Sequence, residues 1–285
     1  MSAMNAPEPN QVGELGKVRL LRRRSRPRVP LRHRMRSEKL RRGVYLIPSL
    51  FTAGNLMCGF FSVIATFNGE FINAALFIIL ANVLDGIDGY AARLTKTTSQ
   101  FGVEFDSLAD VVSFGVAPAV LVYIWALVPW QNWGWLAACT YVVCGALRLS
   151  RFNVQAQGAA KNHFVGLPIP AAAQMITSTV IMFYYLGGAG SPSRHLTLLL
   201  VIYGLAVLMV SNIPYFSLKN NDVRRRHPIW MLVSGIILIT LFIAERHLMF
   251  FTTFLVYTSS GPLLWCLTKL RRQRETRRSP AKALP

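Results

Sequence analysis

Long apolar runs, separated by short polar or basic connections, dominate the chain from residue 49 onward. Many of these runs reach the ~18 to 20 residues that a helix needs to cross a bilayer. The pattern predicts eight membrane-spanning helices, near residues 49–67, 71–93, 103–127, 131–150, 168–187, 195–214, 229–245 and 248–267. The expected fold class is therefore all-α, a polytopic transmembrane helix bundle.

Composition divides the chain into three expected parts. Residues 1–43 and 269–285 are rich in basic residues and offer little apolar surface to bury. We expect a flexible basic arm at the N-terminus and a basic tail at the C-terminus. Residues 44–268 hold all the apolar runs and are expected to form one membrane-embedded domain.

The charge distribution predicts which ends face the cytoplasm. The net charge is +19, with thirteen Lys and Arg against three Glu before Gly43 and seven against one after Thr268. Basic segments stay on the cytoplasmic side, so both termini are expected there, which requires an even number of spans. With eight spans, the cytoplasmic loops hold nine basic residues and the opposite loops hold only Arg194 and Arg246.

The basic arm suits anionic lipid better than nucleic acid. Residues 22–42, its most basic stretch, contain no Phe, Tyr or Trp on which a base could stack, so we expect no nucleic-acid partner. Anionic membrane lipids attract such a segment by about 1 kcal/mol per basic residue. A cleaved organelle transit peptide is a minor alternative, which Pro27 and Pro30 disfavour because they interrupt an amphipathic helix.

Four aspartates flank the connection between the second and third predicted spans. Asp85 and Asp88 are three residues apart and Asp106 and Asp110 are four apart, so each pair shares a helix face. The connection LTKTTSQFG is short, which makes the two helices antiparallel neighbours. Both acidic faces lie near the cytoplasmic ends of their helices and can converge on one polar site.

The cost of these acids indicates a metal site. An Asp near the centre of a membrane helix costs about 2.5 to 3.5 kcal/mol, less near the interface, and four carboxylates together repel one another. Oxygen ligands favour Mg²⁺ or Mn²⁺, and two such ions can clamp a diphosphate. The alternatives are charges that snorkel to the interface and a proton or cation pathway of a transporter. A transporter more often uses broken helices near the midplane.

Glycine and arginine stand beside the acids. Gly86 and Gly89 accompany the first pair, and Gly102 precedes the second. A residue without a side chain lets a phosphate or ribose approach the backbone. Arg93, at the end of the second predicted span, is placed to reach a phosphate.

The spacing D-x2-D-G-x2-A-R-x8-G-x3-D-x3-D, from Asp85 to Asp110, resembles the signature of the CDP-alcohol phosphatidyltransferases, and all eight positions are intact. Further stretches resemble the phosphatidylserine synthase branch: IPSLFTAGNLMCGF (47–60), DSLADVVSFGVAPAVLVY (106–123), CGALRLSRFN (144–153) and GLPIPAAA (166–173). Ser150 is a small departure, since Ala is expected there. The arginine-rich arm is not a fixed feature of the family.

The resemblance implies an enzyme that transfers the phosphatidyl group of CDP-diacylglycerol to L-serine and releases CMP. It implies that the metal ions are held by Asp85, Asp88 and Asp106, with Asp110 as a further ligand. It implies that Asp110 is the general base for the acceptor hydroxyl. It also implies that the CDP pocket is shaped by Gly89, Ala92, Arg93 and Gly102.

Two polar residues of the first predicted span have two open interpretations. Thr52 and Asn55 lie near its cytoplasmic end. They either contact the cytidine or ribose of CDP, or form a hydrogen bond from helix to helix.

The acceptor is assigned to the start of the loop after the fourth predicted span. One of Arg148 and Arg151 is expected to pair with the serine carboxylate and the other with a phosphate, and Asn153 adds neutral hydrogen-bonding capacity. For each arginine the alternative is a positive-inside anchor. The main rival function is a sister enzyme whose acceptor is glycerol phosphate or inositol phosphate.

The expected setting is the bacterial inner membrane, with both termini and the polar site on the cytoplasmic side. Homodimerisation is consistent with the resemblance, while no residue pattern requires it.

Overall fold

The computed structural model describes residues 31–95, 100–157, 166–190, 194–213, 215 and 244–278, and gives the side chains of the first helix from Ser49 onward. The chain divides after Arg41 into two units. The first unit contributes only helical residues 31–41 to the described part. The second unit, Arg42–Pro285, holds the helices that build the site.

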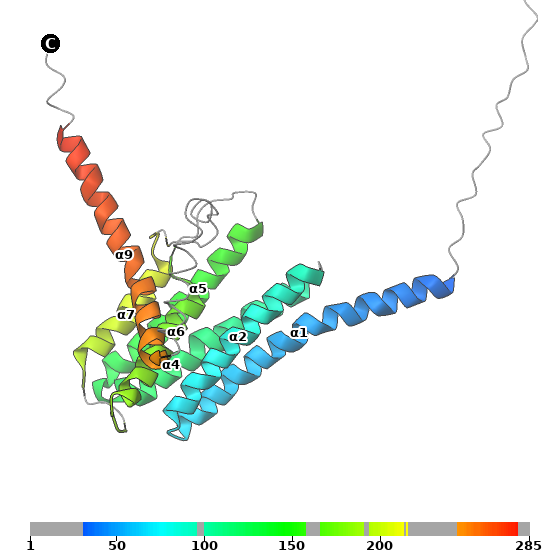
Figure 1. The fold of residues 1–285 in the computed structure, drawn as a ribbon, viewed down its shortest axis with the longest axis horizontal. Coiled ribbons are helices and arrows are strands. Elements are labelled where there is room, and N and C mark those ends of the chain that lie inside the picture. Colours follow the sequence, from blue (N-terminus) through cyan, green and yellow to red (C-terminus); the bar gives the residue numbers. More distant parts are fainter. Residues whose placement is uncertain are drawn as a thin grey trace, which may run out of the picture. The chain divides into compact units, whose positions relative to one another are not determined.

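Every described element is a helix, which confirms the all-α fold class (Figure 1). The α-helices are α1 (Leu31–Phe67), α2 (Phe71–Thr95), α3 (Gln100–Asp110), α4 (Ala117–Val122), α5 (Asn132–Gln157), α6 (Ile169–Tyr185), α7 (Leu196–Val210) and α9 (Arg246–Arg278). Two π-helical segments, η1 (Val111–Val116) and η2 (Tyr123–Leu127), and a 3-10 turn, η3 (Val128–Trp130), complete the described elements.

Four helical segments are long and apolar enough to cross a membrane, and they coincide with four of the predicted spans. They are Ser49–Phe67, Phe71–Ala91, Gln100–Trp130 and Arg246–Leu267. Helices α5, α6 and α7 occupy three further predicted ranges. The predicted span at 229–245 lies almost wholly outside the described residues, so the count of eight stays a prediction.

Large apolar side chains on these helices face outward. Met57 and Phe60 on α1 and Leu108 on α3 are more than half exposed. Outward apolar side chains suit contact with lipid, where burial against protein is not needed to remove them from water. The protein is therefore a membrane protein, although the particular membrane and its orientation there stay predictions.

A tight turn joins α1 to α2. Gly69 has a φ of 78°, a value that favours glycine, and the Glu70 N–H donates to the Ala65 carbonyl at 2.9 Å. The chain reverses within Asn68–Glu70, so α2 runs back beside α1 (Figure 1). The reversal brings the start of the first span close to the end of the second.

The third span is one continuous helical segment from Gln100 to Trp130 whose hydrogen-bonding pattern changes along its length. Directly after Asp110 it widens into η1, where the Ala117 N–H donates to the carbonyl of Val112, five residues earlier. Helix α4 then packs against α2, α5 and α6. Elsewhere α5 packs on α7, and α6 packs on both α2 and α9.

Three helices extend beyond their expected limits. Helix α9 continues to Arg278, through residues 269–278 of the expected basic tail. Helix α5 continues to Gln157, so Arg148, Arg151 and Asn153 lie in a helix and not in the expected loop. Residues 146–157 contain no Gly or Pro to stop it. Helix α1 begins at Leu31, inside the range expected to be a flexible arm. The division at residues 43 and 268 itself stays a prediction.

Candidate functional site

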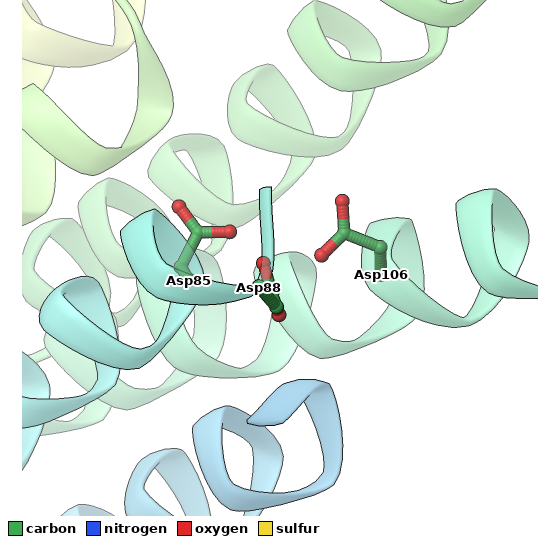
Figure 2. A group of neighbouring side chains, drawn as sticks. All are labelled: Asp85, Asp88 and Asp106. Atoms are coloured by element: carbon green, nitrogen blue, oxygen red, sulfur yellow. The ribbon is translucent and has the colours of Figure 1, made fainter. Parts of the chain in front are cut away.

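Three of the four aspartates form one group, as the spacing predicted. Asp85 and Asp88 come from α2 and Asp106 from α3, and one carboxylate oxygen of each lies within 4.8 Å of the others. Figure 2 shows the carboxyl groups of Asp85 and Asp106 directed into the space between the two helices, with Asp88 between them in this view. Asp88 is buried, and the other two are half-buried.

Asp110 lies one turn along α3 from Asp106 and is buried. Its carboxyl group is in hydrogen-bonding contact with that of Asp85. Two ionised carboxylates in such close contact repel each other unless a cation or a proton lies between them. Asp110 thus borders the group of three and connects it to the interior of the bundle.

Helix α1 supplies the polar partners of two of these acids. The Thr52 hydroxyl donates to Asp88 Oδ2 at 2.9 Å, and Asn55 Nδ2 donates to Asp110 Oδ1 at 3.4 Å. Both side chains of α1 are buried. The hydrogen bond from helix to helix, one of the two interpretations left open by the sequence, is observed for each residue, and the contact with CDP stays a prediction.

The group of three aspartates fits a divalent cation. Mg²⁺ binds oxygen at about 2.1 Å, so two ligands of one ion lie at most about 4.2 Å apart. The oxygens of the three aspartates lie within 4.8 Å of one another. They can therefore bind one ion after a small rotation of a side chain, or two ions that share the carboxylates. Asp106 Oδ1 is buried and has no hydrogen-bond partner among the described residues. A cation would satisfy that oxygen, and a set of carboxylates alone matches a hard ion.

The expected CDP-binding residues are only partly described. Gly89 on α2 and Gly102 on α3 are half-buried near the acids. The side chains of Ala92 and Arg93 lie outside the described part of the chain. A Cβ built on Gly86 would meet nothing within 4 Å, so the surface of α2 is open at Gly86.

The expected acceptor residues point in two directions. Asn153 Nδ2 donates to the Ser107 hydroxyl at 2.8 Å, which brings the end of α5 against α3 beside Asp106. Arg148 is buried and its Nε donates to the Leu167 carbonyl at 3.2 Å. Arg151 donates to the Val210 carbonyl and to Asn212 Oδ1, at 3.4 and 2.8 Å. The arginines thus contact the segments that enter α6 and leave α7.

The sequence did not identify Ser113 and Tyr141, whose hydrogen bonds connect η1 to α1 and to α5. The Ser113 hydroxyl donates to the Asn55 carbonyl at 2.9 Å, and the buried Tyr141 hydroxyl donates to the Phe114 carbonyl at 3.1 Å. Both carbonyl partners belong to the backbone, which a pattern of residue types does not report. The available signal was the presence of Ser113 in an otherwise apolar run.

Comparison with known proteins bears on this geometry. The family model for CDP-alcohol phosphatidyltransferases matches residues 45–213, which contain all four aspartates. The chain is 40% identical over 179 residues to the CDP-diacylglycerol–serine O-phosphatidyltransferase of Helicobacter pylori (strain ATCC 700392 / 26695), an alignment that covers 62% of this chain and 74% of that protein.

Two further relatives extend the comparison. The enzyme of the same description from Bacillus subtilis (strain 168) is 37% identical over 175 residues, 61% of this chain and 92% of that protein. The archaetidylserine synthase of Methanothermobacter thermautotrophicus is 40% identical over 171 residues, 59% of this chain and 69% of that protein. The resemblance seen in the signature is confirmed, and the chain belongs to the CDP-alcohol phosphatidyltransferase family.

Proposed function

We propose that this protein transfers the phosphatidyl group of CDP-diacylglycerol to L-serine, giving phosphatidylserine and CMP. The observation that carries the proposal is the convergence of Asp85, Asp88 and Asp106 on one space, with Asp110 beside them. Serine is favoured as acceptor because relatives that differ in their lipid, from Helicobacter pylori and from a methanogen, share serine in the names of their products or substrates.

The three grouped aspartates are proposed to hold Mg²⁺ or Mn²⁺. A divalent cation bound there would neutralise the diphosphate of the donor and stabilise the leaving CMP. Gly89, Ala92, Arg93 and Gly102 are proposed to shape the rest of the CDP pocket.

Asp110 is proposed to act as the general base. It takes the proton of the serine hydroxyl, and the serine oxygen then attacks the phosphorus that carries diacylglycerol. A new bond forms between that oxygen and phosphorus, and the bond between phosphorus and the CMP oxygen breaks. We propose direct attack, without a covalent intermediate on the enzyme.

The acceptor is proposed to lie where α5 meets α3. The hydrogen bond from Asn153 to Ser107 supports this location, because it brings the end of α5 close to Asp106. Arg148 is a buried cation whose Nε donates to Leu167 at the entry to α6, so its expected binding of the serine carboxylate through two parallel hydrogen bonds stays a prediction. The described hydrogen bonds of Arg151 run to the end of α7, and its expected part in phosphate binding stays a prediction.

In the cell, the protein is proposed to lie in the bacterial inner membrane with both termini and the site on the cytoplasmic side. The diacylglycerol tails of the donor stay in the bilayer while the CDP head enters the site. The basic arm is proposed to contact anionic lipids, and a homodimer is compatible with this arrangement.

The test is CMP release by the purified protein with CDP-diacylglycerol and Mg²⁺ or Mn²⁺, across serine, glycerol 3-phosphate and inositol phosphate. We expect release that depends on serine and falls about 10²- to 10⁴-fold in Asp110→Asn, the usual contribution of a general base. Glu104→Gln is the matched control, because it removes an exposed carboxylate from the same helix.

Each other outcome has a definite meaning. Release with glycerol 3-phosphate but not serine would keep the catalytic site and overturn the acceptor. No release of CMP with any metal and acceptor would refute the proposed transferase activity and favour the alternative function, a cation or proton transporter.

A further inference from the structure

The first span carries a row of buried polar residues on one face. Thr52, Asn55, Ser62 and Thr66 are each at most 4% exposed, and their spacings of three, seven and four residues place them on one side of the helix. The Thr66 hydroxyl donates to the Ser62 carbonyl within α1. Thr52 and Asn55 instead donate to aspartates of the site. Thr52 and Asn55, in the middle of α1, are therefore the residues of this row that are hydrogen-bonded to the site.

Asn55 is attached to the third span at two points. Its side-chain amide donates to Asp110 Oδ1, and its backbone carbonyl accepts from the hydroxyl of Ser113, three residues further along. One turn below, Gly59 permits the close approach: a Cβ there would lie 2.8 Å from the Cα of Ser113. The amide of Asn55 thus has little freedom to move relative to Asp110.

The chemistry of the pair defines its orientation. An ionised carboxylate only accepts hydrogen bonds, so the amide nitrogen of Asn55 must face Asp110. The nitrogen then contacts Oδ1, while the Asp110 carboxyl group also contacts that of Asp85, so the carboxyl group is held from both sides. The contact of 3.4 Å is long, as catalytic hydrogen bonds often are before substrate binds.

We propose that Asn55 is a positioning residue for Asp110: its amide fixes the orientation of the carboxyl group that takes the proton of the acceptor hydroxyl. The inference rests on the proposed function, because it takes Asp110 as the base. It differs from the expectation that Asn55 contacts CDP. Asn55 then acts on the rate of the chemical step and not on the binding of the nucleotide.

The test is Asn55→Ala in the full-length, detergent-purified protein. Five quantities are measured: kcat and the KM for CDP-diacylglycerol from CMP release, the Kd for CDP by calorimetry, the Kd for Mn²⁺ by electron paramagnetic resonance, and Tm. We expect kcat to fall about 10²-fold, as for a misplaced catalytic group, with both Kd values and the KM unchanged.

Two variants accompany it. Ser113→Ala removes the bond to the Asn55 backbone, and we expect a smaller loss of kcat, about fivefold, as for one neutral hydrogen bond, with CDP binding intact. Ser62→Ala is the matched control on the same face of α1. Its hydroxyl has no hydrogen-bond partner among the described residues, so kcat should not change.

The other outcomes overturn the inference in distinguishable ways. A rise of tenfold or more in the Kd for CDP would make Asn55 a nucleotide ligand, as first expected. A parallel loss of Tm, Mn²⁺ binding and CDP binding would make it a structural residue. If Asn55→Ala does not fold, wild-type kcat in Ser113→Ala overturns the inference. If Asp110→Asn keeps full activity, Asp110 is not the general base, and the proposed function is refuted independently of the result for Asn55→Ala.

Discussion

Replacing Gly59 by alanine should impair the enzyme without removing any polar group. Gly59 lies on α1 against η1, and a Cβ there would lie 2.8 Å from Ser113 Cα and 2.5 Å from Ser113 Oγ. Carbon atoms in contact prefer about 3.5 Å, so α1 has to retreat by about 0.7 Å from the backbone of η1. The nearest atoms belong to backbone and Cβ as well as to the hydroxyl, so a rotamer change cannot relieve the clash.

The retreat acts on the site through Asn55, one turn away. Its contact to Asp110 is already 3.4 Å, and a further shift of about 0.7 Å takes it beyond hydrogen-bonding range. A misplacement of this size costs about 10²-fold in rate, or about 2.7 kcal/mol in activation free energy.

The effect on stability should be smaller. Overpacking costs about 1 to 3 kcal/mol, but alanine is favoured over glycine in a helix by about 1 kcal/mol, so the net loss in the free energy of unfolding is about 0 to 2 kcal/mol. Loss of activity in a protein that remains folded is therefore the expected signature.

The assay is CMP release at saturating serine and CDP-diacylglycerol, with Tm measured on the same preparation. Gly204→Ala on α7 is the control, because a Cβ there meets nothing within 4 Å. Wild-type kcat in Gly59→Ala would refute the reasoning, since it would show that close packing of α1 against η1 is not needed for the activity of Asp110.

Three further predictions concern other parts of the protein. Gly166→Ala should lower the free energy of unfolding by about 2 to 5 kcal/mol, measured by thermal unfolding, because φ is 87° and a Cβ would lie 2.6 Å from the Met209 carbonyl oxygen. Gly187→Ala shares the positive φ but has open space, so only about 1 to 2 kcal/mol is expected; equal losses would contradict the steric argument. Arg151→Lys should lower Tm by weakening the contacts to α7 and leave the KM for serine unchanged; a raised KM would place Arg151 at the acceptor. Chelation of divalent cations should abolish CMP release, and Mg²⁺ or Mn²⁺ should restore it; activity that survives exhaustive chelation would exclude the proposed metal site.

The aspartate site was predictable because its evidence is periodic and local. Spacings of three and four residues define a helix face, and the short connection forces α2 and α3 to be neighbours. These two facts predicted that Asp85, Asp88 and Asp106 lie close together, as they do in the structure. The apolar runs likewise located the helices, because the bilayer sets their length.

The partners of those acids were not predictable in the same way. Periodicity shows that Thr52 and Asn55 share a face, but not which helix packs on it, so their hydrogen bonds to Asp88 and Asp110 could not be predicted. The end of α5 also escaped prediction. Hydropathy marks where a helix leaves the bilayer, and tertiary bonds such as that of Arg151 to α7 decide how far it continues.

The π-helical segment η1 makes the site depend on the number of residues in the third span as well as on their identity. Each residue turns a helix by about 100°. A π-helical turn contains about one residue more than an α-helical turn, so deleting one residue between Val111 and Val116 would let the segment relax to an ordinary α-helix and keep α3 in phase with α4. Inserting one residue has no such relief, because it turns α3 by about 100° relative to α4 and takes the carboxylates of Asp106 and Asp110 away from the side of Asp85 and Asp88, although every residue of the signature is still present. An insertion in this stretch is therefore expected to be as damaging as the loss of an aspartate.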